Sequence, residues 1–201
     1  MYVARILYPV KVLGPGNRIG IWLSGCIHQC EGCSNPELWI QKPEQQITIE
    51  TMKELITSIT ENNKVDGFTI TGGDPFYQPY ELTGLLGFLA QLHTDILVYT
   101  GYQYEDIKKK YPDALQYVSV LIDGKYIQGM NHGAVLRGSD NQRIIILDSS
   151  VKDKYIQFLK SERSGIQNFT TADGIISVGI HLPDYKSALK IITRSKGLEE
   201  Q

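Results

Sequence analysis

The stretch Cys26-Ile27-His28-Gln29-Cys30-Glu31-Gly32-Cys33 contains all three cysteines of the chain within eight residues. A disulfide framework normally uses an even number of cysteines, in proteins of an oxidising compartment. Three thiols crowded into one short segment indicate a metal site instead. Close spacing lets a single loop wrap a small inorganic cluster with little loss of chain entropy. We therefore expect the surrounding fold to be organised around this loop.

The residues alone leave the nature of the metal open. Cysteine thiolates hold iron–sulfur clusters, normally four of them for a four-iron cube, so three would leave one iron open to an exogenous ligand. The alternative is zinc, with His28 completing a Cys3His set, although four ligands within eight residues make a cramped zinc site. A thioredoxin-like pair, Cys30 and Cys33, leaves Cys26 unexplained. Three ordinary buried thiols are the remaining alternative.

The composition of the whole chain is that of a globular protein. Of 201 residues, 42% are apolar and 21% charged, and 20 Lys and Arg stand against 22 Asp and Glu. This balance does not suggest binding to nucleic acid or to a membrane surface. The longest apolar runs fall far short of the ~20 residues of a membrane-spanning helix. The start of the sequence lacks a secretory signal, which predicts a cytoplasmic protein.

Strands and helices are expected to alternate around the cysteine loop. Residues 1–18 contain alternating apolar positions and end in the turn signal Gly14-Pro15-Gly16. Continuous apolar runs predict buried strands at 19–23, 68–71, 96–99, 118–122 and 144–147. Helical spacing or helix-start signals predict helices near 49–59, 79–92, 104–111 and 151–159. The pattern indicates an α/β fold, with helices covering a parallel sheet or the outside of a barrel.

The pattern changes near residue 165. Residues 169–180 are expected to form a hairpin that turns at Asp173-Gly174, and a last helix is expected over 184–194. We expect residues 1–164 to form one core domain. Residues 165–201 are expected to be a hairpin-plus-helix appendage and not an independent domain.

Four segments carry a family resemblance that covers residues 5–160. They are GPGNR at 14–18, IWLSGCIHQCEGCSNPELW at 21–39, TGGDP at 71–75 and LRGSDNQRI at 136–144. Together they resemble the radical S-adenosylmethionine superfamily, and within it the activating proteins of anaerobic ribonucleotide reductase, which are glycyl-radical activases. The cysteine loop combined with TGGDP is highly specific, and either piece alone is less so.

The resemblance implies a partial (β/α) barrel of the radical S-adenosylmethionine type. It implies one [4Fe-4S] cluster on Cys26, Cys30 and Cys33, with S-adenosylmethionine bound at the fourth iron. The cofactor would be cleaved reductively, and a glycyl radical would form on a partner enzyme, most simply the large subunit of anaerobic ribonucleotide reductase. A flavodoxin or ferredoxin is the expected electron donor. No catalytic residue is expected beyond the cluster ligands.

The resemblance also assigns cofactor contacts, each with an ordinary alternative. Gly72 and Gly73 suit close backbone approach to a ligand, or merely a turn between strand and helix. Asp123 and Lys125 follow a strand end, where ligand groups gather in β/α folds, but they equally suit a turn with a solvated lysine. Gly32 replaces the aromatic residue that many superfamily members place beside the adenine. The expected cofactor-binding residues are Gly32, Thr71, Gly72, Gly73, Asp74, Thr100, Asp123 and Lys125.

Two other functions remain open from the sequence. A radical enzyme acting on another peptide or on a small molecule would share the same loop, and the unmatched segment 165–201 leaves room for it. A non-catalytic zinc-binding module would use the cysteines with His28. Iron content separates a radical enzyme from a zinc-binding module, because the cluster predicts a brown protein with about four irons per chain.

Overall fold

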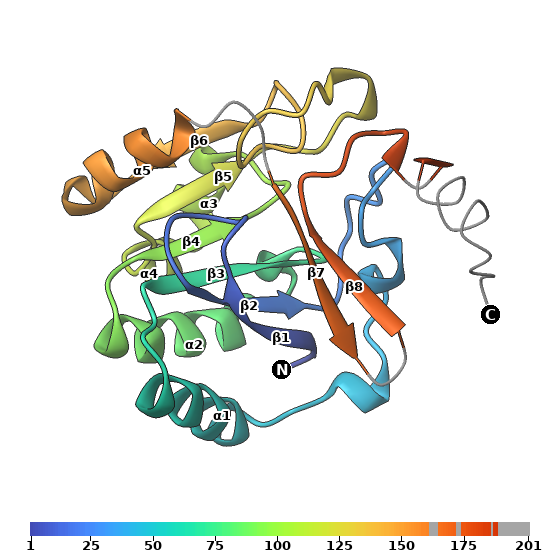
Figure 1. The fold of residues 1–201 in the computed structure, drawn as a ribbon. Coiled ribbons are helices and arrows are strands. Elements are labelled where there is room, and N and C mark those ends of the chain that lie inside the picture. Colours follow the sequence, from blue (N-terminus) through green and yellow to red (C-terminus); the bar gives the residue numbers. More distant parts are fainter. Residues whose placement is uncertain (161–164, 172–173, 186, 189–201) are drawn as a thin grey trace.

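A computed structural model of the chain describes residues 1–160, 165–171, 174–185 and 187–188. Its centre is a six-stranded sheet in the order β1-β2-β3-β4-β5-β6 (Figure 1). The strands are β1 (Val3–Val10), β2 (Arg18–Leu23), β3 (Gly67–Gly72), β4 (Ile96–Tyr99), β5 (Val120–Asp123) and β6 (Arg143–Ile146). The five strands predicted from apolar runs are therefore present. The fold is mixed α/β, and the curvature of a partial barrel stays a prediction.

The sheet is parallel in its middle and antiparallel at both edges. β2, β3, β4 and β5 pair in parallel, whereas β1 pairs antiparallel with β2 and β6 antiparallel with β5. The connections explain both edges. The turn at Gly14-Pro15-Gly16 is too short for a parallel crossover, and residues 124–142 contain no α-helix to cross the sheet. The expected parallel sheet is therefore present in the middle, and its two edge strands are antiparallel.

The part of the chain that the structure describes contains five named α-helices beside this sheet. They are α1 (Ile49–Asn62), α2 (Pro79–Leu92), α3 (Tyr104–Lys110), α4 (Pro112–Leu115) and α5 (Lys152–Leu159). Short 3-10 turns lie at Pro36–Leu38, Pro43–Gln45, Pro75–Tyr77, Gln128–Met130 and Ser149–Val151. Thr48 caps α1, as its spacing predicts, by accepting a hydrogen bond from the Thr51 backbone N–H at 3.1 Å. None of the helices in the described residues is both long and apolar enough to cross a bilayer.

Alternating strand residues divide the core between the two faces of the sheet. Ile96 and Val98 point into a large cluster under α1, α2, α3 and α4, whereas their neighbour Leu97 packs on the opposite face with Tyr155 of α5. This is the two-residue period of a strand. Helices thus cover one face completely, and α5 covers only part of the other.

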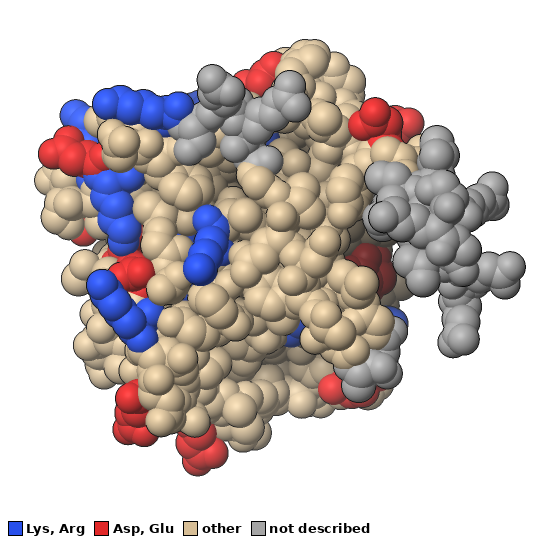
Figure 2. All heavy atoms as spheres, viewed as in Figure 1, with Lys and Arg blue, Asp and Glu red and all other residues tan. Residues whose placement is uncertain are grey.

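A separate hairpin covers the rest of the second face. It consists of β7 (Ile166–Thr171) and β8 (Gly174–Gly179), which pair antiparallel and cross in front of β1 and β2 (Figure 1). The predicted hairpin is confirmed. Its turn residues 172–173 and most of the expected helix 184–194 lie outside the described residues. On this face Lys and Arg gather over α5, while the surface over the hairpin and β1 is mostly uncharged (Figure 2).

A buried ionic network fixes the amino ends of the central strands. Arg18 opens β2 and is fully buried, and its guanidinium Nη1 lies 3.0 Å from a carboxylate oxygen of Asp95, just before β4. Asp95 also accepts hydrogen bonds from Lys154 Nζ at 2.6 Å and from the Tyr155 hydroxyl at 2.8 Å. Both partners belong to α5, so the network ties this helix to the sheet.

Candidate functional site

A pocket lies at the carboxyl ends of the four parallel strands. Its wall takes Cys26 after β2, Thr71 and Gly73 at the end of β3, Thr100 after β4 and Gly124 after β5. Because parallel strands bring their carboxyl ends to one edge, four segments distant in sequence meet there. Ligands bind at this edge in open α/β sheets, so the pocket is the candidate site.

All three cysteines line this pocket, and all are free thiols of intermediate exposure. The loop that carries them is anchored at its start, where the Gly25 and Cys26 backbone N–H groups donate to the carbonyls of Leu38 and Trp39 at 2.8 and 3.0 Å. Backbone N–H groups also reach two of the sulfurs: His28 donates to Cys26 Sγ, and Asn35 donates to Cys33 Sγ, each at 3.4 Å.

The donor set suits an iron–sulfur cluster. N–H groups directed at sulfur stabilise the thiolate form and tune the potential of a bound cluster. Burial raises the pKa of the Cys26 and Cys30 thiols, so binding an iron cluster, which needs thiolates, would release protons from them. Trp39 lines the same pocket and adds an apolar wall that limits the access of water.

The contacts of His28 do not favour the role of a zinc ligand. Its Nε2 lies 3.0 Å from Asp74 Oδ2, and its ring meets Tyr102 edge-on with 4.7 Å between the ring centroids. An imidazole nitrogen directed at a carboxylate supports the neighbouring wall of the pocket. Within the described residues, no three His, Cys, Asp or Glu side chains already surround one ion position.

The close packing of strand ends leaves no room for a side chain at Gly72 and Gly73. Gly72 has φ +120°, and a Cβ there would lie 2.2 Å from the Leu23 carbonyl oxygen. A Cβ on Gly73 would lie 2.4 Å from the Gly25 carbonyl oxygen. The two glycines therefore let β3 approach the chain that leads into the cysteine loop. Gly73 also lines the pocket, whereas Gly72 does not.

Asp74 joins the ends of β3 and β4. Its buried carboxylate accepts hydrogen bonds from the Phe76 N–H at 2.9 Å, the Gly101 N–H at 2.8 Å and the Thr100 hydroxyl at 3.1 Å. A carboxylate with these donors is already satisfied by the protein. The geometry makes Asp74 a residue that positions the pocket wall, and direct contact with a cofactor stays a prediction.

Three other predicted contacts do not line this pocket. The Asp123 carboxylate is fully buried and accepts hydrogen bonds from the Tyr104 N–H at 2.7 Å and from both Nε and Nη2 of Arg143. Lys125 borders a separate surface hollow. Gly32, at φ +68°, comes close to Gln128, because a Cβ there would lie 2.7 Å from Gln128 Oε1. Cofactor roles for these three residues stay predictions.

One wall of the pocket is not predicted by any sequence pattern. Residues 177–181, at the end of β8 and just beyond it, line the pocket together with the cysteines. Tyr126 and Gln142, from the long connection between β5 and β6 and its end, line it as well. No local pattern marks these residues, because only the docking of the hairpin and of the connection brings them to the cysteine loop.

Comparisons with known proteins agree with the cysteine chemistry. A family model described as a 4Fe-4S single cluster domain matches residues 12–145. The chain is 40% identical over 143 residues to the anaerobic ribonucleoside-triphosphate reductase-activating protein of Enterobacteria phage T4, covering 69% of this chain and 90% of that protein. The chain belongs to this family of activating proteins.

Bacterial members of the family give the same result. The activating protein of Vibrio cholerae is 35% identical over 145 residues, covering 68% of this chain and 93% of its own length. The activating protein of Escherichia coli K12 is 31% identical over 143 residues, covering 67% of this chain and 92% of its own length. The match to the family model includes the cysteine loop and the strand ends around the pocket, and it ends before the hairpin.

Proposed function

We propose that this protein is a radical S-adenosylmethionine activase that generates a glycyl radical on anaerobic ribonucleotide reductase. The observation that carries the proposal is the convergence of Cys26, Cys30 and Cys33 on one pocket in a chain of this family. When bound, a [4Fe-4S] cluster with S-adenosylmethionine supplies one-electron cleavage of the sulfonium to methionine and 5′-deoxyadenosine, whose new hydrogen comes from the partner's glycine.

The residues of the chain hold and shield these groups. The three thiolates would hold the cluster and leave one iron free for S-adenosylmethionine. Thr71 and Gly73 lie at the pocket wall, where their backbone carbonyls would suit the cofactor's amino group. Asp74 keeps that wall aligned with the end of β4. A water-poor pocket protects a reactive carbon radical from side reactions.

The electron has to reach the cluster from outside the chain. We propose a flavodoxin or ferredoxin as the donor and the cytoplasm as the location, as the family resemblance implies. Residues 1–164 would form the catalytic core with residues 165–201 attached to it, and no binding to nucleic acid or membrane is proposed.

The test is anaerobic incubation of the reconstituted protein with a reductant, S-adenosylmethionine and the cognate reductase. We expect a glycyl radical on the reductase by electron paramagnetic resonance, with methionine and 5′-deoxyadenosine as products. Cys30→Ala should abolish cleavage because one iron loses its thiolate. Cleavage without a signal on the reductase would indicate another substrate. A colourless protein with one tightly held zinc would contradict the proposal.

A further inference from the structure

The β7–β8 hairpin is fastened to both sides of the sheet. At one side the Gln167 side chain accepts from the Lys11 N–H at 2.9 Å and donates to the Pro9 carbonyl at 2.7 Å, at the carboxyl end of β1. At the other side the His181 carbonyl accepts from Asn131 Nδ2 at 2.8 Å, in the connection after β5. The hairpin therefore bridges the two halves of a sheet whose edge strands β1 and β6 do not pair.

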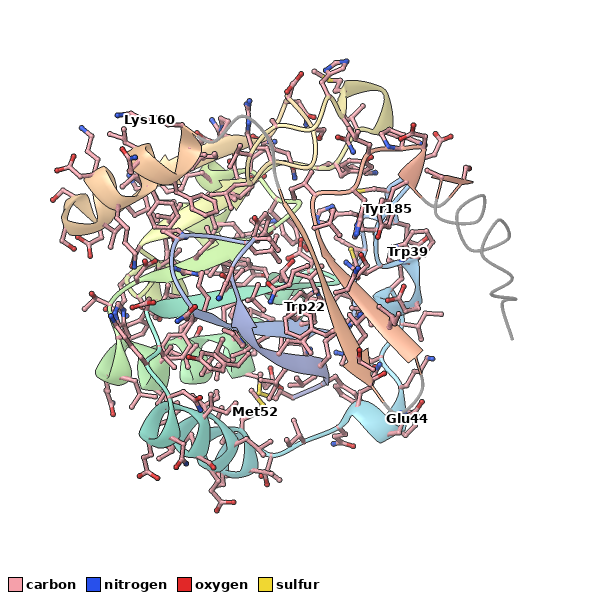
Figure 3. All side chains as sticks on the ribbon, viewed as in Figure 1. Trp22, Trp39, Glu44, Met52, Lys160 and Tyr185 are labelled. Atoms are coloured by element: carbon pink, nitrogen blue, oxygen red, sulfur yellow. The ribbon has the colours of Figure 1, made fainter. Side chains whose placement is uncertain are left out.

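Apolar packing makes the hairpin part of the core. Val178 of β8 is only 3% exposed and shares a cluster with Leu13, Trp22 and Leu38. Trp22 lies beneath the hairpin in Figure 3, where β7 and β8 cover β2. Leu38 supplies the carbonyl that anchors the cysteine loop at Gly25. The hairpin thus packs against Leu38, whose backbone carbonyl anchors the cysteine loop.

A polar row in β8 and the segment just beyond it lies at the pocket. Ser177 and His181 both line it, and Ser177 Oγ lies 3.1 Å from His181 Nε2 and 2.8 Å from the Tyr185 hydroxyl. The rings of His181 and Tyr185 are 4.3 Å apart between centroids. Hydroxyl and imidazole groups both donate and accept hydrogen bonds, which is the chemistry that matches the N–H and C=O groups of a peptide main chain.

We propose that the hairpin is the substrate-side wall of the reaction pocket and that Ser177 and His181 position an extended, glycine-containing peptide segment of the partner. The inference rests on the proposed function, because that reaction brings a peptide backbone to the cofactor. The row at the pocket consists of a hydroxyl and an imidazole, which favours an uncharged main chain over a charged group.

The hairpin also lies outside the segment that the family model matches. A wall at this place would select which segment of the partner enters the pocket, without any change in the cysteine loop. Specificity for the partner would then depend on Ser177 and His181 as well as on the family core.

The experiment compares Ser177→Ala and His181→Ala with the exposed control Ile175→Ala, which lies on β8 but does not line the pocket. The readout is the number of glycyl radicals formed on the cognate reductase per S-adenosylmethionine cleaved. Loss of a main-chain hydrogen bond should lower this ratio by about fivefold in each pocket variant. His181→Asn, which keeps a donor and an acceptor, should recover part of it. The ratio of the control should equal that of the wild type.

A purely structural role predicts a different result. Cleavage and radical yield would then fall together and the ratio would not change, which would overturn the inference. Hydrogen exchange on the wild-type protein with the reductase tests the same wall without any variant. Protection of residues 174–181 supports the proposal, and unchanged exchange there contradicts it. If the reductase protects this segment of the wild-type protein but no glycyl radical forms, the proposed function is refuted. The inference that the hairpin binds the partner is then still supported.

Discussion

Replacing Asp74 by Asn tests whether its carboxylate holds the pocket wall together. Oδ1 accepts from the Phe76 N–H and Oδ2 accepts from the Gly101 N–H, at 2.9 and 2.8 Å. Asparagine has nearly the same shape but only one side-chain oxygen. In either orientation of the amide, one of the two backbone N–H groups faces an NH2 group and loses its acceptor.

The magnitude follows from the burial of this site. Asp74 is 1% exposed, so a backbone N–H that loses its acceptor there cannot readily donate to bulk water instead. A buried donor without a partner costs about 1–3 kcal/mol, and hydrogen bonds to a charged acceptor are at the upper end of the range for such bonds. We therefore expect Asp74→Asn to lower the free energy of unfolding by about 2–3 kcal/mol.

Urea denaturation of the metal-free protein under anaerobic conditions measures this loss. Thr100→Val is the matched control. It removes a hydroxyl that donates to Asp74 and accepts from the Tyr102 N–H at 3.2 Å, while both backbone partners of Asp74 remain. It should cost about 1–2 kcal/mol, less than Asp74→Asn. If Asp74→Asn unfolds at the same urea concentration as the wild type, the carboxylate does not align β3 with β4. The positioning role would then be refuted.

Further predictions concern backbone strain and the buried network. Gly72→Ala should destabilise by at least ~2 kcal/mol, because its Cβ would meet the Leu23 carbonyl at 2.2 Å, whereas Gly84→Ala, with open space in α2, should stabilise by up to about 1 kcal/mol in thermal denaturation. Asp95→Asn should cost about 3–5 kcal/mol by leaving Arg18 buried without its counter-ion, and a loss below about 1 kcal/mol would contradict this. Burial alone would raise the pKa of Asp95, but Arg18 and Lys154 outweigh it and hold that pKa below its usual value. Its stabilisation should therefore be complete above the unfolded-state pKa of about 3.9 and be lost as pH falls through the lower folded-state value, which acid titration of wild type against Asp95→Asn measures.

Local patterns in the sequence predict much of the fold, because they depend on neighbouring residues. The apolar runs at 19–23 and 96–99 become central strands, and Thr48 caps its helix where the spacing places it. The orientation of β6 is not encoded in its apolar run. It follows from a connection without a crossover helix, which apolar periodicity does not detect.

In the candidate site, too, local patterns predict some features and tertiary contacts decide the others. The cysteine spacing alone indicates a metal loop, and the structure brings all three thiols to one pocket. The direction of Asp123 depends on Arg143, its cross-strand partner in β6, and no spacing rule relates the two residues. The hairpin wall depends likewise on contacts of Gln167 and Asn131 with distant backbone groups. Such tertiary contacts decide which predicted residues face the pocket.

The central claim is that three thiolates leave one iron open and that S-adenosylmethionine binds there. Electron–nuclear double resonance on the reduced, reconstituted protein tests this most directly, using S-adenosylmethionine labelled with 15N at its amine and 17O at its carboxylate. Both labels should couple to the cluster. Absence of coupling from both labels, in a protein that carries its full complement of iron, would contradict it.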